Sequence, residues 1–420
     1  MGKLLPYSIK SLHDLSILIL VFSLPFFHKF STVAIVLVLL PSLIEIIDRR
    51  EFPSIRMHWF LPVLYFYYVI SELVSGGTAH ALEKRHMLIL IPLAVALNEN
   101  FNSGQLRNRI FKSFIVANLL AVLIMAGRAL VRSVALQDGD WIFNPKVIHD
   151  TNHDFLTSSV MGGNYFFAED FSFFQHPTYA GIQLVFAQYL IFELFGYAKK
   201  KERIGLVVVY FVFQLGLFLL SSKAAIITSL LVAFWILFRL NINLFAKVAS
   251  LAGCAVLCML FVFFNPRLRV FIDTFSVAQL THPDPNARFG HDVRILSWDA
   301  SMDVIKANWL VGVGEAHKTP VLVDVYTHKG YVVPAEQQLN SHNQSLEFLV
   351  GGGIVAFGIF AAGILTLGIM GIRAGDYVFL TFLAIVVFNS LFESLLERHA
   401  AILFFAVFVS LLANRRQSLS

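Results

Sequence analysis

Hydrophobic and polar residues alternate in long blocks along this chain. Apolar runs of roughly helix length recur throughout, and short polar segments between them carry most of the charge. Such runs predict membrane helices, because a helix needs about 20 apolar residues to cross a bilayer. Several runs are shorter than this, so a pair of them could form a re-entrant hairpin. The twelve runs cover residues 13–28, 32–47, 57–75, 86–98, 109–131, 177–197, 204–221, 224–242, 245–264, 344–372, 376–392 and 399–413.

Composition places the chain in the membrane class. Of its 420 residues, 57% are hydrophobic and only 14% are charged, far from the balance of a soluble domain. Cys254 and Cys258 lie inside an apolar run, which indicates small membrane-helix residues. The first run passes almost directly into the second, so we expect no cleavable signal peptide. We predict an all-α integral membrane protein with about twelve transmembrane helices.

Lysine and arginine gather in every second loop. Short loops rich in these residues face the cytoplasm, and an even number of helices then places both termini there. The net charge of +5 follows from this topology, so we expect no binding to nucleic acid. The basic segments are "DRREFPSIR", "QLRNRIFK", "AKKKER", "RLNINLFAK", "GIRAGD" and "NRRQSLS".

The same orientation sends two long polar segments to the opposite face, which is the periplasm in a bacterial cell. We therefore divide the chain into residues 1–264, with nine helices and a periplasmic segment near 132–176, a large periplasmic loop at 265–342, and three helices at 343–420. Residues 292–308 predict an amphipathic helix. The loop is expected to cap the helical bundle and to leave a cavity beneath it.

Several polar residues lie where this outer face meets the membrane. Lys223 stands in the tight turn "LLSSKAAI", although snorkelling alone explains a lysine there. Arg294 and Trp298 are four residues apart on one helical face, which is also typical of an interfacial cation–π pair. His176 directly precedes Pro177 at a helix start, where a capping or packing role is more common than catalysis.

Spacing sets aside several familiar chemistries. The segment "VGVGEAH" lacks the lysine and the hydroxyl with which a P-loop holds phosphate and metal. In "HDTNH" the two histidines are four residues apart, but no glutamate follows the first one, as a zinc peptidase requires. The chain has no Gly-x-Ser-x-Gly elbow. An ATP-driven transporter and a soluble-type hydrolase are therefore disfavoured.

Three motifs follow one another in this topology. The first is a basic residue in an outward turn, "SSKAA". The second is an arginine four positions before an aromatic residue, "VRILSW", followed by the Gly-x-Gly of "VGVG". The third is a histidine at the end of the large loop, "SHNQSLEFLVGGG". In this combination the chain resembles the O-antigen ligase and polymerase superfamily of polytopic glycosyltransferases, most closely over roughly 174–400. Lys223 departs from the arginine usual in the ligases, and lysine lacks the planar fork that binds phosphate through two bonds.

The resemblance implies a substrate pair and a site. The donor is expected to be a glycan on polyprenyl diphosphate, and the acceptor a hydroxyl of lipid A-core or of a growing glycan. Arg294, Lys223 and Arg288 are expected to offset the diphosphate charge, with His176 as a further substrate-binding candidate. His342 is expected to take the acceptor proton, because an imidazole can do so near neutral pH. We expect no cofactor and no metal. The alternative for His342 is a helix-start residue with Ser341 or Asn343 as the cap.

The family also has an acidic residue near the outward end of the eleventh helix, where this chain has Glu393. Glu393 and Glu397 share one helical face if the eleventh helix extends that far. A carboxylate at this position could orient His342 or hold Arg294 through an ion pair. The alternative is a closed pair with Arg398 that only shapes the hairpin.

Two classes of function remain after this reasoning. The first is a glycosyltransferase in the bacterial inner membrane, with an O-antigen ligase ahead of a polymerase. The second is a flippase for lipid-linked sugar, which would place charges along a membrane-crossing cavity. The few interior charges and the polar segments on one face favour the transferase.

Overall fold

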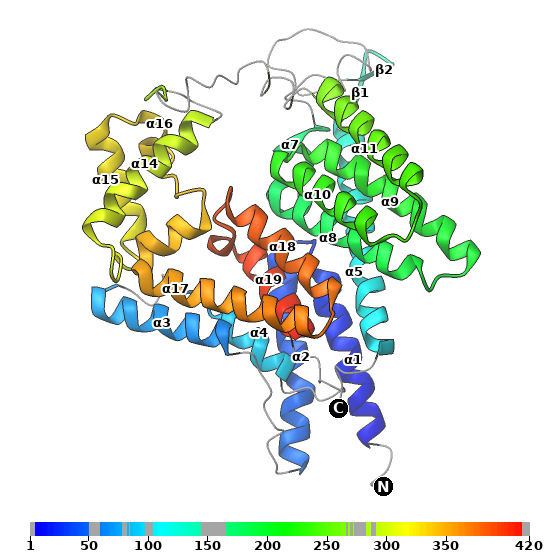
Figure 1. Ribbon diagram of the computed structural model, residues 1–420, viewed down its shortest axis with the longest axis horizontal. Coiled ribbons are helices and arrows are strands. Elements are labelled where there is room, and N and C mark those ends of the chain that lie inside the picture. The colour runs from blue at the N-terminus through cyan, green and yellow to red at the C-terminus, as the bar shows by residue number, and fades with distance from the viewer. Residues whose placement is uncertain are drawn as a thin grey trace. The chain divides into compact units, whose positions relative to one another are not determined.

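The computed structural model describes residues 5–49, 59–77, 82–83, 85–96, 104–143, 165–265, 268, 272, 283–286 and 291–413. Helices make up almost all of its regular structure (Figure 1). In chain order, the elements are α1 (Leu5–Ser23), α2 (His28–Arg49), α3 (Phe60–Ser75), α4 (Met87–Ala96), α5 (Gly104–Ser133), β1 (Val134–Gln137), β2 (Asp140–Phe143), α7 (Ala168–Phe171), α8 (Pro177–Phe195), α9 (Lys200–Leu220), α10 (Lys223–Arg239), α11 (Leu244–Phe264), α14 (His291–Ala307), α15 (Lys318–Lys329), α16 (Val332–Glu336), α17 (Gln344–Arg373), α18 (Tyr377–Ser390), the 3₁₀ turn η3 (Leu395–Glu397) and α19 (His399–Ala413).

The apolar runs and the helices coincide. Each of the twelve runs overlaps one helix among α1–α5, α8–α11 and α17–α19, which confirms the predicted all-α class. Among the described residues, five helices are long and apolar enough to cross a membrane. Shorter apolar stretches lie in α1, α2, α3, α4, α18 and α19, so the number of crossings stays a prediction. The five long spans are Gly104–Ser133, Pro177–Phe195, Lys200–Leu220, Leu244–Phe261 and Gln344–Arg373.

A short hairpin is the exception to the helical pattern. Strands β1 and β2 pair antiparallel, with Gln137 opposite Asp140. Asp138 and Gly139 form the two-residue turn, with φ values of 53° and 91°. An Asp-Gly pair favours a hairpin turn because both positions require positive φ. The sequence interpretation assigned this segment only to a polar periplasmic region and missed the hairpin.

The chain divides into two compact units. The first comprises Met1–Leu24, His28–Ile110 and Phe275–Ser420, and the second comprises Pro25–Phe27 and Phe111–Thr274. In the second unit, α8 packs against α9 and α10 and is buried along most of its length. In the first unit, α19 packs against α4 and is similarly buried, while α17 packs against α3. Each unit therefore has its own helical core.

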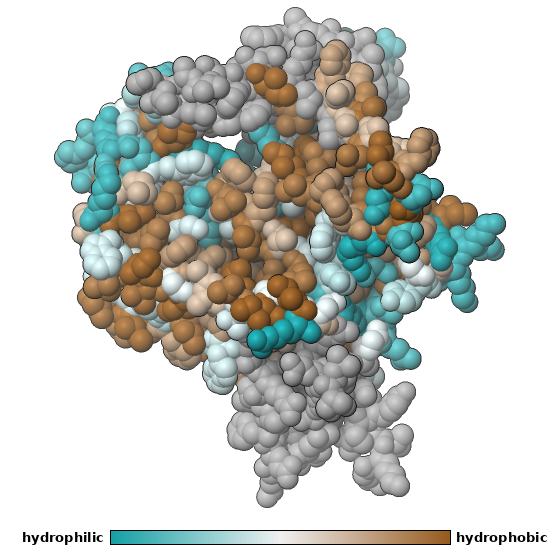
Figure 2. Space-filling view, in the orientation of Figure 1, coloured by the Kyte–Doolittle hydropathy of each residue, from teal (hydrophilic) through white to brown (hydrophobic). Residues whose placement is uncertain are grey.

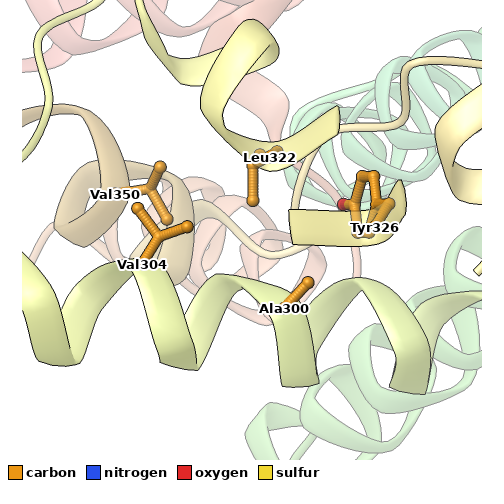
Figure 3. Close-up of a cluster of buried hydrophobic side chains, with 5 residues drawn as sticks. All are labelled: Ala300, Val304, Leu322, Tyr326 and Val350. Atoms are coloured by element: carbon orange, nitrogen blue, oxygen red, sulfur yellow. The ribbon is translucent and has the colours of Figure 1, made fainter. Parts of the chain in front are cut away.

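The segment predicted to cap the bundle contains three helices, α14, α15 and α16, in its described part. The predicted amphipathic helix at 292–308 is α14, and it packs against α15 and α17. The contact is a small apolar core that α14, α15 and α17 all contribute to (Figure 3). Its buried members are Ala300, Val304, Leu322, Tyr326 and Val350. This core fixes α14 and α15 against the first two turns of α17, in front of which His342 stands.

The "VGVG" segment docks onto a break in α17. At Gly353 the backbone leaves the helix, with φ 61° and ψ −162°. The Val313 N–H donates to the Val350 carbonyl and the Gly314 N–H to the Gly351 carbonyl, each at 2.9 Å. A Cβ at Gly312 would lie 2.5 Å from the backbone of Gly351 and Gly352, so the close approach needs glycine. The break thus joins the 309–314 loop to α17 through backbone hydrogen bonds.

Apolar side chains cover the outside of several helices. Brown, hydrophobic residues dominate the visible surface over α9, α11 and α17, whereas teal residues gather over α14 and α15 (Figure 2). On α11, Val248, Val256, Met259 and Phe263 are all more than half exposed. Such surfaces suit contact with lipid, since they would be costly in water over this length.

Candidate functional site

The backbone at His342 has an unusual conformation. His342 precedes α17 with a φ of 45°, in the left-handed region. Asn343 is the N-cap of α17, and its Oδ1 accepts hydrogen bonds from the Ser345 and Leu346 N–H groups at 2.9 and 3.1 Å. The His342 N–H donates to Asn340 Oδ1 at 3.0 Å. The capping role therefore belongs to Asn343, and the imidazole of His342 is not used for it.

Glu393 lies between Arg294 and His342. Arg294 Nη2 donates to Glu393 Oε1 at 2.8 Å, and His342 Nδ1 lies 3.6 Å from Glu393 Oε2. The carboxylate is mostly buried, with 11% of its side chain exposed, while Arg294 is 35% exposed and His342 26%. Three of the residues singled out from the sequence therefore meet, although they come from α14, the start of α17 and the turn after α18.

This arrangement differs from part of the sequence reasoning. The eleventh predicted helix, α18, ends at Ser390, so Glu393 and Glu397 do not share one helical face; the latter lies in η3. Glu397 pairs with Arg85 and Lys318, and Glu393 pairs with Arg294. The cation–π contacts found among the described residues do not join Arg294 to Trp298.

A buried charge cluster lies next to this group. It consists of Arg85, Lys318, Glu315, Glu347 and Glu397, which are all almost fully buried. Lys318 Nζ lies 2.9 Å from Glu315, 2.7 Å from Glu347 and 3.0 Å from Glu397. Arg85 pairs with Glu315 and Glu397, and its guanidinium stacks 4.1 Å above the ring of Tyr68. Buried charges require such partners because each loses its hydration.

Burial and pairing shift the ionisation of this cluster in opposite senses. Burial disfavours the charged form of Lys318, but the three carboxylates outweigh it and raise its pKa well above the ordinary lysine value. Burial raises the pKa of Glu315, and the nearby Glu397 adds to the rise although Arg85 opposes it. The cluster holds three carboxylates against two cations, so a proton on Glu315 would balance its charge.

The buried charge cluster supports the backbone beside His342. Glu347 Oε2 accepts a hydrogen bond from the Ser341 N–H at 3.0 Å, while the Ser341 hydroxyl accepts one from Ser301 at 3.0 Å. Sequence reasoning missed Glu347 and Lys318. The signal was present for Glu347, because a carboxylate four residues into a long apolar run needs a partner. No local spacing identified that partner as Lys318.

A cavity of about 500 Å³ opens beside His342. Its described lining includes four carboxylates, two cations and several amide side chains, with His342 among them. Arg294 is not among the described residues that line it. The charged members of the lining are Glu83, Glu315, Glu347, Glu397, Lys318 and Arg398.

The other predicted residues lie elsewhere in the chain. Lys223 is the first residue of α10, after a turn in which Ser221 has a φ of 52° and Ser222 is the N-cap. His176 is the N-cap of α8, and its Nδ1 accepts from the Thr178 N–H at 3.4 Å, which confirms its capping role. Both belong to the second unit. Arg288 lies outside the described residues.

Within the described part of the chain, no group of three or more His, Cys, Asp or Glu side chains is arranged to hold a metal ion.

Comparison with known families gives one match. A family model described as O-antigen ligase matches residues 206–361. This segment contains Lys223, Arg294 and His342, and the match confirms the resemblance to the O-antigen ligase and polymerase superfamily of membrane glycosyltransferases. A comparison with curated proteins finds no match.

Proposed function

We propose that this protein is a metal-independent O-antigen ligase-type glycosyltransferase of the bacterial inner membrane. In this proposal it moves a glycan from a polyprenyl diphosphate carrier to a hydroxyl of lipid A-core on the periplasmic face. The observation that carries the proposal is the group formed by His342, Glu393 and Arg294 beside a polar cavity. The family match over residues 206–361 supports the reaction class.

The proposed chemistry follows from these three residues. His342 accepts the proton of the acceptor hydroxyl as the oxygen attacks the sugar carbon that leaves the diphosphate. Glu393, 3.6 Å from Nδ1, orients the ring and offsets the positive charge that the ring acquires. An arginine carries five N–H donors, and Glu393 takes one from Arg294, so others remain for a phosphate oxygen.

Three further residues complete the proposal. Lys223 and Arg288 add countercharge to the leaving diphosphate, and His176 contacts the substrate. A lysine provides charge without a two-bond fork, so Lys223 acts as a point charge. These roles rest on the resemblance and on the position of Lys223 at the first turn of α10.

A second candidate is a polysaccharide polymerase of the same superfamily, since the matching family segment is consistent with both. A lipid-linked glycan flippase is less well supported. The lipid-linked glycan that accumulates in cells without this protein discriminates among the three. Full-length glycan on the carrier indicates a ligase, single repeats indicate a polymerase, and donor trapped on the cytoplasmic side indicates a flippase.

The direct test is His342→Ala in the purified protein. We expect transfer from the polyprenyl diphosphate donor to lipid A-core to be abolished while membrane insertion and expression are retained. His328→Ala is the matched control, because His328 is an exposed histidine of α15 with 77% of its side chain accessible. Substantial transfer by the His342 variant would sink the catalytic assignment.

A further inference from the structure

We propose that the 309–314 loop, although it belongs to the long segment predicted to be periplasmic, lies in the outer leaflet of the membrane. There Trp309, Leu310 and Val311 contact lipid at the boundary between headgroups and acyl chains. This placement depends on the predicted topology and does not depend on the proposed reaction. Three observations carry it: the exposed apolar side chains of the loop, the position of the break along α17, and the pairing of backbone groups at the break.

The loop exposes three consecutive apolar side chains. Trp309, Leu310 and Val311 are 60%, 50% and 55% exposed. Elsewhere in the same segment, hydrophilic residues gather over α14 and α15 (Figure 2). A contiguous apolar patch of this kind marks a surface that contacts a partner or a membrane. A tryptophan beside aliphatic residues is typical of the membrane interface, which makes lipid the occupant that fits.

The end of α3 beside this loop is also apolar and exposed. Leu73 and Val74, in the last turn of α3, are 77% and 81% exposed. The neighbouring Glu72 accepts a hydrogen bond through its Oε1 from the Ala316 N–H at 3.0 Å, two residues beyond the loop. The two apolar surfaces therefore belong to adjacent parts of the first unit, and lipid that contacts the end of α3 is also within reach of the loop.

The break in α17 lies about one membrane thickness from the predicted cytoplasmic end of that helix. From Ile354 to Ile372 the sequence has no charged residue, and Arg373 follows in a basic segment assigned to the cytoplasm. With a rise of about 1.5 Å per residue, Gly353 lies about 30 Å along the helix from Arg373. This is roughly the thickness of the hydrocarbon core, and any tilt of the helix brings the break closer to its centre. The loop shares this level, because the Ile354 N–H donates to the Trp309 carbonyl at 2.8 Å.

The backbone groups at the break are paired in the way that lipid requires. Non-helical backbone at membrane depth is tolerated only where the protein itself satisfies or covers its polar groups. The Ile354 N–H donates to Trp309, and the Val350 carbonyl, its partner in an unbroken helix, accepts instead from the Val313 N–H at 2.9 Å. The Gly351 carbonyl likewise accepts from the loop. In water these groups would be solvated without the loop, whereas in lipid the loop has to supply their partners.

Nitroxide labels can measure which medium surrounds the loop. Full-length protein with Cys254 and Cys258 replaced by serine carries Leu310→Cys, is labelled there, and is reconstituted into phosphatidylcholine vesicles. Collisions of the label with oxygen, which concentrates in lipid, are compared with collisions with a water-soluble nickel chelate. Thr327→Cys is the aqueous control, because Thr327 is an exposed residue of α15, and Leu365→Cys is the lipid control, because Leu365 is 66% exposed within the apolar part of α17.

We expect the ratio of oxygen to nickel collisions at Leu310 to exceed the ratio at Thr327 at least about fivefold and to approach that at Leu365. A ratio equal to that at Thr327 would place the loop in water. Infrequent collisions with both reagents would place it against protein, either a partner or a second copy of this chain. Each of these two results would overturn the proposal.

A second measurement leaves the loop unchanged. Trp309 becomes the only source of tryptophan fluorescence when the other four are replaced by phenylalanine, at Trp59, Trp141, Trp235 and Trp298. Lipids brominated at the top of their acyl chains should quench its emission by at least about one half, and aqueous iodide should quench it little. Quenching by iodide without quenching by brominated lipid would reject the membrane placement, even if the labelled variant failed to fold.

Discussion

The break in α17 gives a prediction that needs no substrate. Gly353 has φ 61° and ψ −162°, a conformation that residues with a Cβ almost never adopt. A Cβ at this position would overlap the carbonyl group of Leu310 and would lie 2.5 Å from the backbone nitrogen of Val311. These are backbone atoms, and they are held in place because the Ile354 N–H donates to the Trp309 carbonyl at 2.8 Å. Gly353→Ala should therefore destabilise the first unit.

The magnitude follows from two costs. The strained backbone costs about 1–3 kcal/mol, and overpacking against fixed atoms costs about 1–3 kcal/mol more. The free energy of unfolding should fall by about 2–6 kcal/mol on this basis. A change of 1 kcal/mol shifts the midpoint of a domain of 150–250 residues by about 2–4 °C, so the midpoint should fall by roughly 5–20 °C.

Thermal unfolding in detergent, followed by circular dichroism, measures this change. Gly358→Ala is the matched control in the same helix, because no atom lies within 4 Å of a Cβ built there. It should alter stability by less than about 1 kcal/mol, in the stabilising direction. If Gly353→Ala unfolded within about 2 °C of the wild type, the docking of the 309–314 loop onto α17 would be refuted.

Three other predictions concern charged groups. Glu393→Asp shortens the side chain whose carboxylate reaches both Arg294 and His342. We expect kcat to fall about 10- to 100-fold, which corresponds to a rise of about 1.4–2.7 kcal/mol in the activation free energy, with folding retained. Wild-type transfer by Glu393→Gln would remove Glu393 from the site. Lys318→Met removes the ammonium that pairs with three buried carboxylates, so the free energy of unfolding should fall by about 3–5 kcal/mol. Thermal unfolding measures this change, and an unchanged midpoint would contradict the buried pairing. Burial raises the pKa of Asp299, but its hydrogen bonds, first of all from Lys329, lower it overall. A folded-state pKa below the unfolded value gives stability that is present above about pH 4 and is lost at lower pH. The protection factors of amide protons in α14 and α15, which correct for the intrinsic pH dependence of exchange, should therefore fall between about pH 5 and pH 3; constant protection factors would contradict this prediction.

The helices were predictable because their cause is local. A run of apolar residues long enough to meet lipid defines a helix without knowledge of any other part of the chain. The same holds for the amphipathic α14, whose boundaries differ from the prediction by one residue at each end. The meeting of Arg294, His342 and Glu393 was expected only because topology and family resemblance placed them near one face. Residue spacing alone does not imply it.

The buried charge cluster could not be derived in this way. Arg85 lies 230 residues from Glu315 and 312 residues from Glu397, and no periodicity connects such positions. In the sequence Arg85 resembles any charge near a helix end. The break at Gly353 was hidden for a related reason, since three consecutive glycines in an apolar run also suit close packing of unbroken membrane helices. The Asp-Gly hairpin was locally encoded and should have been predicted.

The position of Arg85 has a consequence for the order in which the chain assembles during synthesis. Arg85 is 1% exposed, and the carboxylates of Glu315 and Glu397 with which it pairs are synthesised more than 200 residues later. The second unit consists almost entirely of Phe111–Thr274, so its residues are complete before either partner emerges. Domains generally fold as units during synthesis, and a buried charge without its partner is strongly unfavourable. The ribosome must therefore deliver η3 before the surroundings of Arg85 can close, and the segment between α3 and α4, although synthesised early, is among the last to reach its final packing.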